Sequence, residues 1–280
     1  MICNIDGDIL CLTGYCAIFC ILGYKSLSRL KGGIPKKFPW GEALSFINDL
    51  IEIFEKNKIP VSERDADFFS KYYELLSETN SKINLTSVTD PKDVIVKHFL
   101  DSVIPSPIIP INSLLADIGS GAGLPGIPLK IVRDDISLTM IESTGKKARF
   151  LENTVTNLGL ERTYIFSQRA EVLARGTLRN RFDVVTARAV APLNILLEYA
   201  MPLLWKGGLF IAYKGPGAHE EIEAAKRAAD ILGGELQEKW EFNLNGEYKR
   251  IILIFKKTED TPDEFPRENK NLLRKPLGEI

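Results

Sequence analysis

A glycine-rich segment between an apolar run and a helix-like stretch is the part of the chain best suited to binding a ligand. Residues 115–126 read Leu-Ala-Asp-Ile-Gly-Ser-Gly-Ala-Gly-Leu-Pro-Gly. Glycines at alternate positions allow a tight turn and let backbone N–H groups approach a ligand without Cβ atoms in the way. The spacing G-x-G-x-x-G at 121–126 matches a dinucleotide fingerprint, although such a match alone is weak. The segment therefore predicts a nucleotide-type ligand and leaves its identity open.

Two acidic residues and a proline accompany this loop. Asp117 ends the expected strand before it, and Glu142 ends the following expected strand. A carboxylate at Glu142 can accept both hydroxyls of a ribose; the alternative is a solvated strand end. Asp117 either contacts the methionine part of a cofactor or holds the turn by accepting backbone N–H groups. NAD and S-adenosylmethionine (SAM) both carry a ribose, but Pro125 offers no N–H for a pyrophosphate and so favours SAM.

Composition restricts the class of protein. The chain has 280 residues, of which 45% are hydrophobic and 26% charged, and its net charge is −1. Such values are typical of a soluble globular protein, and any RNA-binding site must be a local basic patch. All four cysteines lie in the first twenty residues, and there are two histidines. We therefore expect neither a metal site nor a disulfide framework.

Residues 1–38 are interpreted as an atypical N-terminal extension. The apolar run at 9–22 is too short for a comfortable membrane span, and no basic residue precedes it as in a signal peptide. A spurious upstream extension, a poorly ordered tail and a weak anchor remain as interpretations. The first two are favoured, and no membrane partner is expected.

Residues 39–110 are predicted to form a helical cap. Apolar residues recur with helical spacing between Glu42 and Lys58. A second helix should follow Ser62, which can form a capping box with Asp65. A third should begin at Asp90-Pro91, where a capping residue precedes a proline, and run to 101–103.

Residues 111–257 are predicted to form a Rossmann-like core. Almost continuous apolar runs alternate with helix-like segments, which is typical of a parallel, doubly wound sheet covered on both faces. The last two runs flank Asn245-Gly246, a hairpin signal. The expected strands are 113–118, 136–141, 162–167, 182–187, 208–214, 236–242 and 250–256, with helices at 125–132, 144–158, 168–175, 191–204 and 217–232. Seven strands of α/β type with the last one antiparallel are the arrangement of SAM methyltransferases.

Residues 258–280 are a charged, proline-containing tail. It follows Lys256 and Lys257 and carries Arg267, Lys270 and further basic residues. A solvated, disordered end and a basic arm that rests on RNA phosphates both remain open.

Several motifs, in order, resemble the RsmG (GidB) family of small-subunit ribosomal RNA methyltransferases. The motifs are Asn84-Leu85-Thr86-Ser87-Val88, His98-Phe99-Leu100-Asp101-Ser102, the loop 117–128, Glu142-Ser143, Gly145-Lys146-Lys147, Arg149-Phe150-Leu151, Arg169-Ala170-Glu171, Ala187-Arg188-Ala189 and Lys214-Gly215. They span residues 40–280. The first forty residues have no counterpart in typical members. Tyr248-Lys249-Arg250 stands where many members have Glu-Arg and an aliphatic residue, so Lys249 would replace an arginine.

The resemblance implies that the chain uses SAM to methylate N7 of one guanosine in 16S-type small-subunit rRNA, whether free RNA or an assembling subunit. It also implies that Gly119, Leu124, Ala170, Glu171 and Arg188 line the SAM site. From the loop pattern we add Asp117, Gly121 and Glu142 to the cofactor-binding residues. The chain is expected to act as a monomer in the cytoplasm.

The chemistry of guanine N7 explains why no nucleophile–base pair is needed. N7 carries a lone pair and no proton, so methyl transfer is a direct displacement, and the enzyme mainly supplies proximity worth about 7–11 kcal/mol. Arg188, after the fourth expected strand, is a candidate catalytic residue: it can bind guanine O6, a phosphate or the SAM carboxylate, or pair with an acid. Lys214, at the end of the fifth strand, is the second candidate.

Other charged residues are weaker candidates. Lys146, Lys147 and Arg149 lie at a helix start, where positive charge opposes the dipole and hints at RNA. Arg169 and Lys249 are also possible contacts, whereas His98 is predicted to be structural. The competing functions are a methyltransferase for another RNA position or a protein, an NAD-dependent oxidoreductase, and an RNA-binding module without activity.

Overall fold

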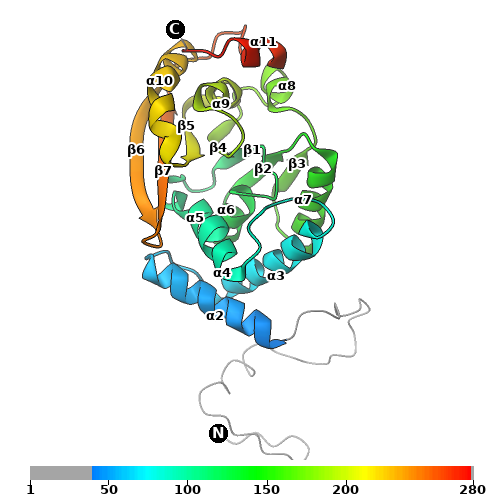
Figure 1. Ribbon diagram of the computed structural model, residues 1–280. Helices are drawn as coiled ribbons and strands as arrows, with labels where there is room; N and C mark the ends of the chain where they lie inside the picture. Colours follow the sequence, from blue (N-terminus) through cyan, green and yellow to red (C-terminus); the bar gives the residue numbers. More distant parts are fainter. Residues whose placement is uncertain (1–39, 279–280) are drawn as a thin grey trace, which may run out of the picture. The chain divides into compact units, whose positions relative to one another are not determined.

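The structure, a computed structural model, describes residues 40–278. The predicted extension 1–38 and its four cysteines lie outside the described residues. Cap, core and tail together belong to one compact unit that begins at Pro39. The fold is a seven-stranded sheet with helices on both faces (Figure 1).

The sheet confirms the predicted α/β methyltransferase architecture. Its strand order is β3-β2-β1-β4-β5-β7-β6. Strands β1 to β5 run parallel, and β7 is antiparallel to both β5 and β6. The strands are β1 (Leu114–Ile118), β2 (Ser137–Ile141), β3 (Thr163–Phe166), β4 (Phe182–Arg188), β5 (Leu204–Lys214), β6 (Gly234–Leu244) and β7 (Tyr248–Lys257). No second βαβ unit follows β5 within residues 40–278, which is the feature that an NAD-binding Rossmann domain would need.

The helices lie where the apolar spacing predicts them, with differences near prolines. They are α2 (Trp40–Lys56), α3 (Glu63–Asn80), α4 (Pro91–Val94), α5 (Asp101–Val103), α6 (Gly126–Val132), α7 (Gly145–Leu158), α8 (Ala170–Arg175), α9 (Leu193–Ala200), α10 (Ile222–Ile231) and α11 (Asn269–Arg274). Short 3-10 turns are η3 (Ser106–Ile108), η4 (Met201–Leu203) and η5 (Pro216–Glu221). The helix expected at 191–204 ends at Ala200 because Pro202 cannot donate to a continuing helix.

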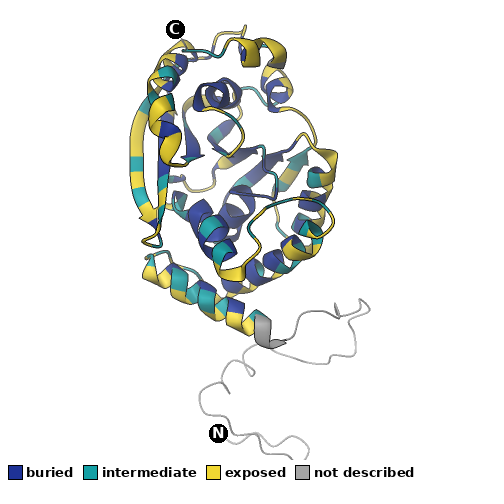
Figure 2. Cartoon of the chain, viewed as in Figure 1, coloured by how far each residue is buried: buried dark blue, intermediate teal, exposed yellow. Residues whose placement is uncertain are grey.

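Different helices pack on the two faces of the sheet. One core cluster joins β1, β4, β5 and β7 to α8, α9 and α10, and it includes Phe265 and Leu272 of the C-terminal segment. On the other side, α3 contacts both α6 and α7, and α2 packs on α3. Buried aromatic rings hold this second layer together, with Phe99 stacked on Tyr72 at 5.2 Å between ring centroids. Figure 2 shows the central strands and the inward sides of the helices as buried, whereas β6 is largely exposed.

The cap contains the predicted helices and one irregular turn. Ser62 caps α3, and the capping box with Asp65 is present in both directions. The third helix starts after Asp90 as expected but changes to a π-helical turn, η2 (Ile95–Leu100), before α5. Its widened geometry is seen where the Asp101 N–H donates to the Val96 carbonyl, five residues back. Such turns are rare and frequently mark functional sites.

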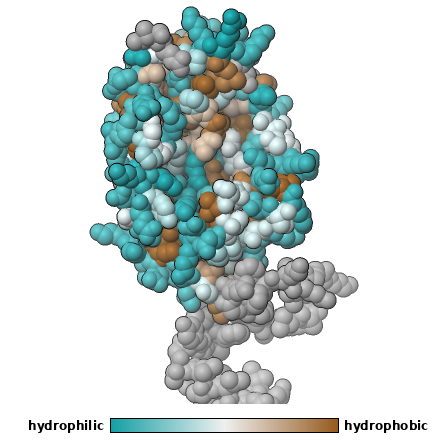
Figure 3. All heavy atoms as spheres, in the orientation of Figure 1, coloured by the Kyte–Doolittle hydropathy of each residue, from teal (hydrophilic) through white to brown (hydrophobic). Residues whose placement is uncertain are grey.

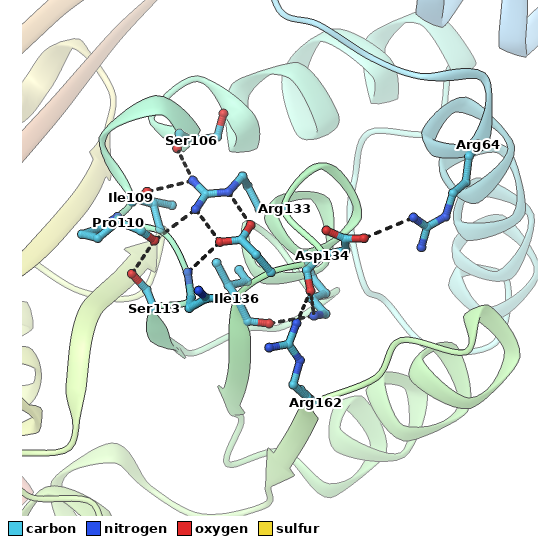
Figure 4. A network of polar contacts seen from close by, with 12 residues as sticks. Arg64, Ser106, Ile109, Pro110, Ser113, Arg133, Asp134, Ile136 and Arg162 are labelled. Atoms are coloured by element: carbon cyan, nitrogen blue, oxygen red, sulfur yellow. Dashed lines mark hydrogen bonds and ion pairs between the residues drawn. The ribbon is translucent and has the colours of Figure 1, made fainter.

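A polar network fixes the amino edge of the sheet (Figure 4). Arg133 forms a two-point contact with Asp135 at 2.6 and 2.7 Å and donates to the carbonyls of Ser106, Ile109 and Pro110. Lys130 and Arg162 both donate to the Asp134 carbonyl. These contacts tie the α6–β2 connection to the end of the cap.

The C-terminal segment is ordered and packs on the core up to residue 278. Arg267 makes a two-point contact with Glu198, whose side chain is completely buried in α9. Arg175 and Arg179 donate to the carbonyls of Pro266 and Phe265. The interpretation as a disordered end therefore does not describe this segment, and Arg267 is engaged in an internal contact.

Replacing Arg267 with alanine should destabilise the protein. The change leaves the Glu198 carboxylate buried without its guanidinium, and breaking a buried pair in this way costs about 3–5 kcal/mol. We expect a loss of that order in the free energy of unfolding, measured by urea denaturation. Arg274→Ala, an exposed cation in α11, is the control, with a change below about 0.5 kcal/mol. Equal effects of the two substitutions would contradict this role of Arg267.

Candidate active site

The register of the sheet brings three of the predicted site residues to one edge. Ile118 of β1 pairs with Ile141 of β2 on one side and with Ala187 of β4 on the other. Gly119, Glu142 and Arg188 follow these three residues directly. Because β1, β2 and β4 are parallel, their carboxyl ends open on a common crevice.

The glycine loop after β1 has the backbone conformation that its sequence predicts. Gly119, Gly121 and Gly123 all have positive φ, at 65°, 56° and 92°, which residues with a Cβ rarely adopt. The Gly119 N–H donates to the Ile141 carbonyl at 2.8 Å and ties the loop to β2. The cap supports it from below, since the Tyr72 hydroxyl of α3 donates to the Ala122 carbonyl. The loop is thus held from the sheet and from the cap.

Asp117 holds the turn from inside. Its carboxylate is fully buried and accepts hydrogen bonds from the Gly126 N–H at 3.2 Å and the Thr186 hydroxyl at 3.0 Å. A Cβ on Gly126 would lie 3.0 Å from Asp117 Oδ2, so glycine permits this close approach. Burial raises the pKa of Asp117 to about 7. These contacts favour the turn-holding alternative over a direct contact with a cofactor.

Glu142 lies beside the glycine loop at the end of β2. One carboxylate oxygen accepts the Gly121 N–H at 2.9 Å, and the other accepts the Thr144 N–H at 2.7 Å. Each oxygen of a carboxylate has two lone pairs, so both oxygens can accept a further bond from a hydroxyl. The residue is buried, which argues against the alternative of a solvated strand end.

The remaining residues that the resemblance assigns to the cofactor are also buried near this edge. Leu124 lies in the glycine loop, and Ala170 and Glu171 begin α8, which follows β3. The β3 strand is hydrogen-bonded to β2, where the Glu142 N–H donates to the Phe166 carbonyl. These residues thus extend the edge of the crevice beyond Glu142.

Arg188 joins the sheet to the cap through a shared carboxylate. Its Nη1 lies 3.0 Å from Asp101 Oδ2, and the Nε of Arg250 lies 3.1 Å from Asp101 Oδ1. The Asp101 side chain is 6% exposed, whereas those of Arg188 and Arg250 are 14% and 24% exposed. Arg188 thus forms the ion pair with an acid that was one of its predicted roles. Both guanidinium groups remain partly exposed at the crevice.

His98 is neutral and fully engaged. Its Nδ1 lies 2.7 Å from Nη2 of Arg188 and 3.1 Å from the Lys97 carbonyl; because the guanidinium can only donate, we assign Nδ1 as the acceptor and the proton to Nε2. Nε2 then donates to the Thr86 hydroxyl at 2.7 Å. Burial, reinforced by the charge of Arg188, lowers the pKa of His98 to about 4. This arrangement supports the predicted structural role, and it leaves no imidazole lone pair for a general base.

The depressed pKa of His98 should make the fold sensitive to acid. The unfolded chain binds a proton at a pKa near 6.5 while the folded chain resists it down to about 4, so stability falls as pH falls between these values. As the pH falls from roughly 7 to 5, proton uptake at His98 in the unfolded chain should lower the free energy of unfolding by about 2 kcal/mol. We expect His98→Asn, which keeps an acceptor for Arg188, to lose that part of the pH slope in urea denaturation. An unchanged slope would be inconsistent with a buried neutral imidazole.

Lys214 lines a pocket together with Arg188. A pocket of about 340 Å³ is lined by Arg188, Lys214 and Arg250, and by the carboxylates of Asp101 and Glu221. Lys214 pairs with Glu221 at 2.8 Å. With three cations and two carboxylates, the lining is net positive and suits an anionic or acceptor-rich ligand.

The pocket adjoins the glycine loop through the turn after β4. Ala189 has a φ of 56°, and the next side chain, Val190, lies over Gly119, where a Cβ would come within 2.6 Å of it. The turn after β4 therefore connects the cationic pocket to the glycine loop.

Sequence reasoning missed several residues of this site. Arg250, Glu221 and Tyr72 had no assigned role, and Asp101 was noted only within a motif. Successive residues of β7 point to opposite faces, and Arg250 rather than Lys249 reaches Asp101.

The weaker predicted contacts lie on the surface. Lys146 and Arg149 are exposed in the first turn of α7, and Arg169 is exposed just before α8. The face seen in Figure 3 is mostly hydrophilic, with apolar residues scattered over it. Residues 40–278 contain no cluster of three or more side chains suited to holding a metal ion. No helix in that range has the length and apolar character needed to cross a membrane.

Comparisons with known proteins give one consistent result. The family profile described as rRNA small subunit methyltransferase G (GidB) matches residues 65–248. A protein of Staphylococcus epidermidis named ribosomal RNA small subunit methyltransferase G is 41% identical over 82% of this chain and 98% of its own length. One of the same name from Geobacillus kaustophilus is 42% identical over 80% and 96%. Among solved structures, P. horikoshii TYW2 in complex with MeSAdo aligns with 57% of this chain and 62% of its own, at 15% identity and a TM-score of 0.48; that likeness is too distant to support a conclusion.

Proposed function

Because the chain belongs to the rRNA small subunit methyltransferase G family, we propose that it methylates N7 of one guanosine in 16S-type small-subunit rRNA. Membership confirms the predicted resemblance, and the methyl donor of the family is SAM. The observation that supports the finer proposal is the union of a glycine loop with a cation-lined pocket at one edge of the sheet.

The residues of the glycine loop fit this donor. When bound, SAM supplies a methyl group on a positively charged sulfonium. Glu142 has acceptor capacity for two ribose hydroxyls. Gly119 and Gly121 expose backbone next to the crevice, and Leu124 and Ala170 offer apolar surface. Asp117 keeps the loop in this shape from behind.

The charged groups of the pocket suit an RNA substrate. Arg188 and Lys214, from the neighbouring strands β4 and β5, both line it and can donate to guanine O6 or to phosphate oxygens. Guanine N7 has no proton to remove, so the proposed reaction requires no general base, and both nitrogens of His98 are engaged in hydrogen bonds. The residues therefore act by alignment and electrostatics. Action as a cytoplasmic monomer stays a prediction.

Nucleoside analysis tests this proposal. The protein is incubated with SAM and purified small-subunit rRNA from cells that lack it, and the RNA is digested and examined by mass spectrometry. We expect N7-methylguanosine to appear with small-subunit RNA and not with large-subunit RNA. Methylation of another nucleoside would keep the family and reject the N7 proposal.

A further inference from the structure

The Asp101 carboxylate contacts two arginines, and this arrangement points to a role for Asp101 that the proposed function does not yet include. It lies between two arginines that come from β4 and β7, and all three line the same pocket. We propose that Asp101 is a positioning residue that holds Arg250 toward the pocket, so that the Arg250 guanidinium binds an RNA phosphate beside the target nucleotide. This inference rests on the proposed function, because it needs an RNA substrate in the pocket.

Contacts between the cap and the sheet hold Asp101 beside the two arginines. The π-helical turn η2 adds width just before Asp101. His98, Asp101 and Ser102 all lie against Arg188, with Nη1 to Ser102 Oγ at 3.4 Å. Tyr213 of β5 fixes the turn from the sheet by donating to the Ser102 carbonyl at 2.7 Å.

Arg250 depends on Asp101 more than Arg188 does. Arg188 is also held by His98 Nδ1 at 2.7 Å. For Arg250, the contacts are with Asp101 and with the carbonyl of its own neighbour, Lys249. Without the carboxylate, Arg250 loses the contact that orients it across the sheet.

Arg250 retains the donors that a phosphate requires. A guanidinium has five N–H groups, and the contacts with Asp101 and Lys249 use two of them. The Arg250 side chain is 24% exposed, compared with 14% for Arg188. Its planar fork matches two phosphate oxygens, and the positive lining of the pocket favours an anion.

A double-mutant cycle tests the inference. Transfer of tritiated methyl groups from SAM to small-subunit rRNA is measured for the wild type, Asp101→Asn, Arg250→Ala and the double variant, with KM for RNA and kcat separated. We expect each single change to raise KM by about tenfold or more with little change in kcat, and the double change to be no worse than Arg250→Ala alone. In each variant, the slope of log K for RNA against log[salt] should also be smaller, by about the amount expected for one lost phosphate contact.

Three outcomes would overturn the inference: losses that multiply in the double variant, an unchanged salt dependence in Arg250→Ala, or a wild-type KM in Asp101→Asn. Asp67→Asn, which removes an exposed ion pair on α3, is the matched control and should behave as the wild type. If Asp101→Asn does not fold, Arg250→Gln carries the test through the same KM and salt measurements. The assay counts methyl groups whatever atom they reach, so a failure of the N7 proposal is distinguishable from a failure of this one.

Discussion

Replacing Arg188 with alanine is expected to lower kcat/KM for methylation of small-subunit rRNA by about a thousandfold or more. The side chain lies at the end of β4, next to the turn that covers Gly119 and on the wall of the pocket. Because Arg188 lines the pocket and the turn that follows it packs on Gly119, its loss should disturb both the bound cofactor and the target base. Steady-state methyl transfer measures the effect.

The same variant is expected to remain folded. After the change, Asp101 keeps its contact with Arg250, so the buried carboxylate still has one cationic partner. We therefore expect a single cooperative thermal transition and an unchanged circular dichroism spectrum. Arg181→Ala, which removes an exposed cation at the other end of β4, is the control and should retain activity. Full activity of Arg188→Ala would reject its role.

The second large effect is expected at Glu142. Its carboxylate accepts the Gly121 and Thr144 N–H groups and faces the crevice at the end of β2. Alanine removes the proposed ribose acceptor and an anchor of the glycine loop, and two hydrogen bonds to a charged acceptor are together worth about 3 kcal/mol or more. We expect the Kd for SAM, measured by titration calorimetry, to rise by about a hundredfold or more.

Two further variants make this result specific. Glu142→Gln keeps one acceptor oxygen but turns an N–H₂ group toward a backbone donor, so its Kd should lie between those of the wild type and Glu142→Ala. Glu161→Ala, an exposed acid before β3, should bind SAM normally. A Kd for Glu142→Ala within about threefold of the wild type would show that the carboxylate does not hold the cofactor.

Local patterns predicted most of the fold. Apolar runs placed every strand of the sheet, the Ser62–Asp65 box placed the start of α3, and Asn245-Gly246 placed the hairpin between β6 and β7. These signals depend on neighbours in the chain. The sequence did not reveal that the C-terminal segment packs on α9, because nothing near Glu198 or Arg267 indicates that they meet across 69 positions.

The candidate site was predictable in its glycine loop and strand ends, and less so in its contacts. Gly119, Glu142, Arg188 and Lys214 follow from the rule that parallel strands end at one edge. The partnership of Asp101 with Arg250 joins residues 149 positions apart, and Asp101 directly follows the π-helical turn η2. Single-sequence patterns contain no signal for either feature.

The most direct test of the proposed function is to map N7-methylguanosine along small-subunit rRNA. Borohydride followed by aniline cleaves RNA at this nucleoside, so RNA from cells without the protein can be compared before and after treatment with the protein and SAM. Methylation at N7 of one guanosine predicts a single new cleavage, which Arg188→Ala should not produce. If the RNA gains methyl groups but shows no new cleavage, the proposal of methylation at guanine N7 is contradicted.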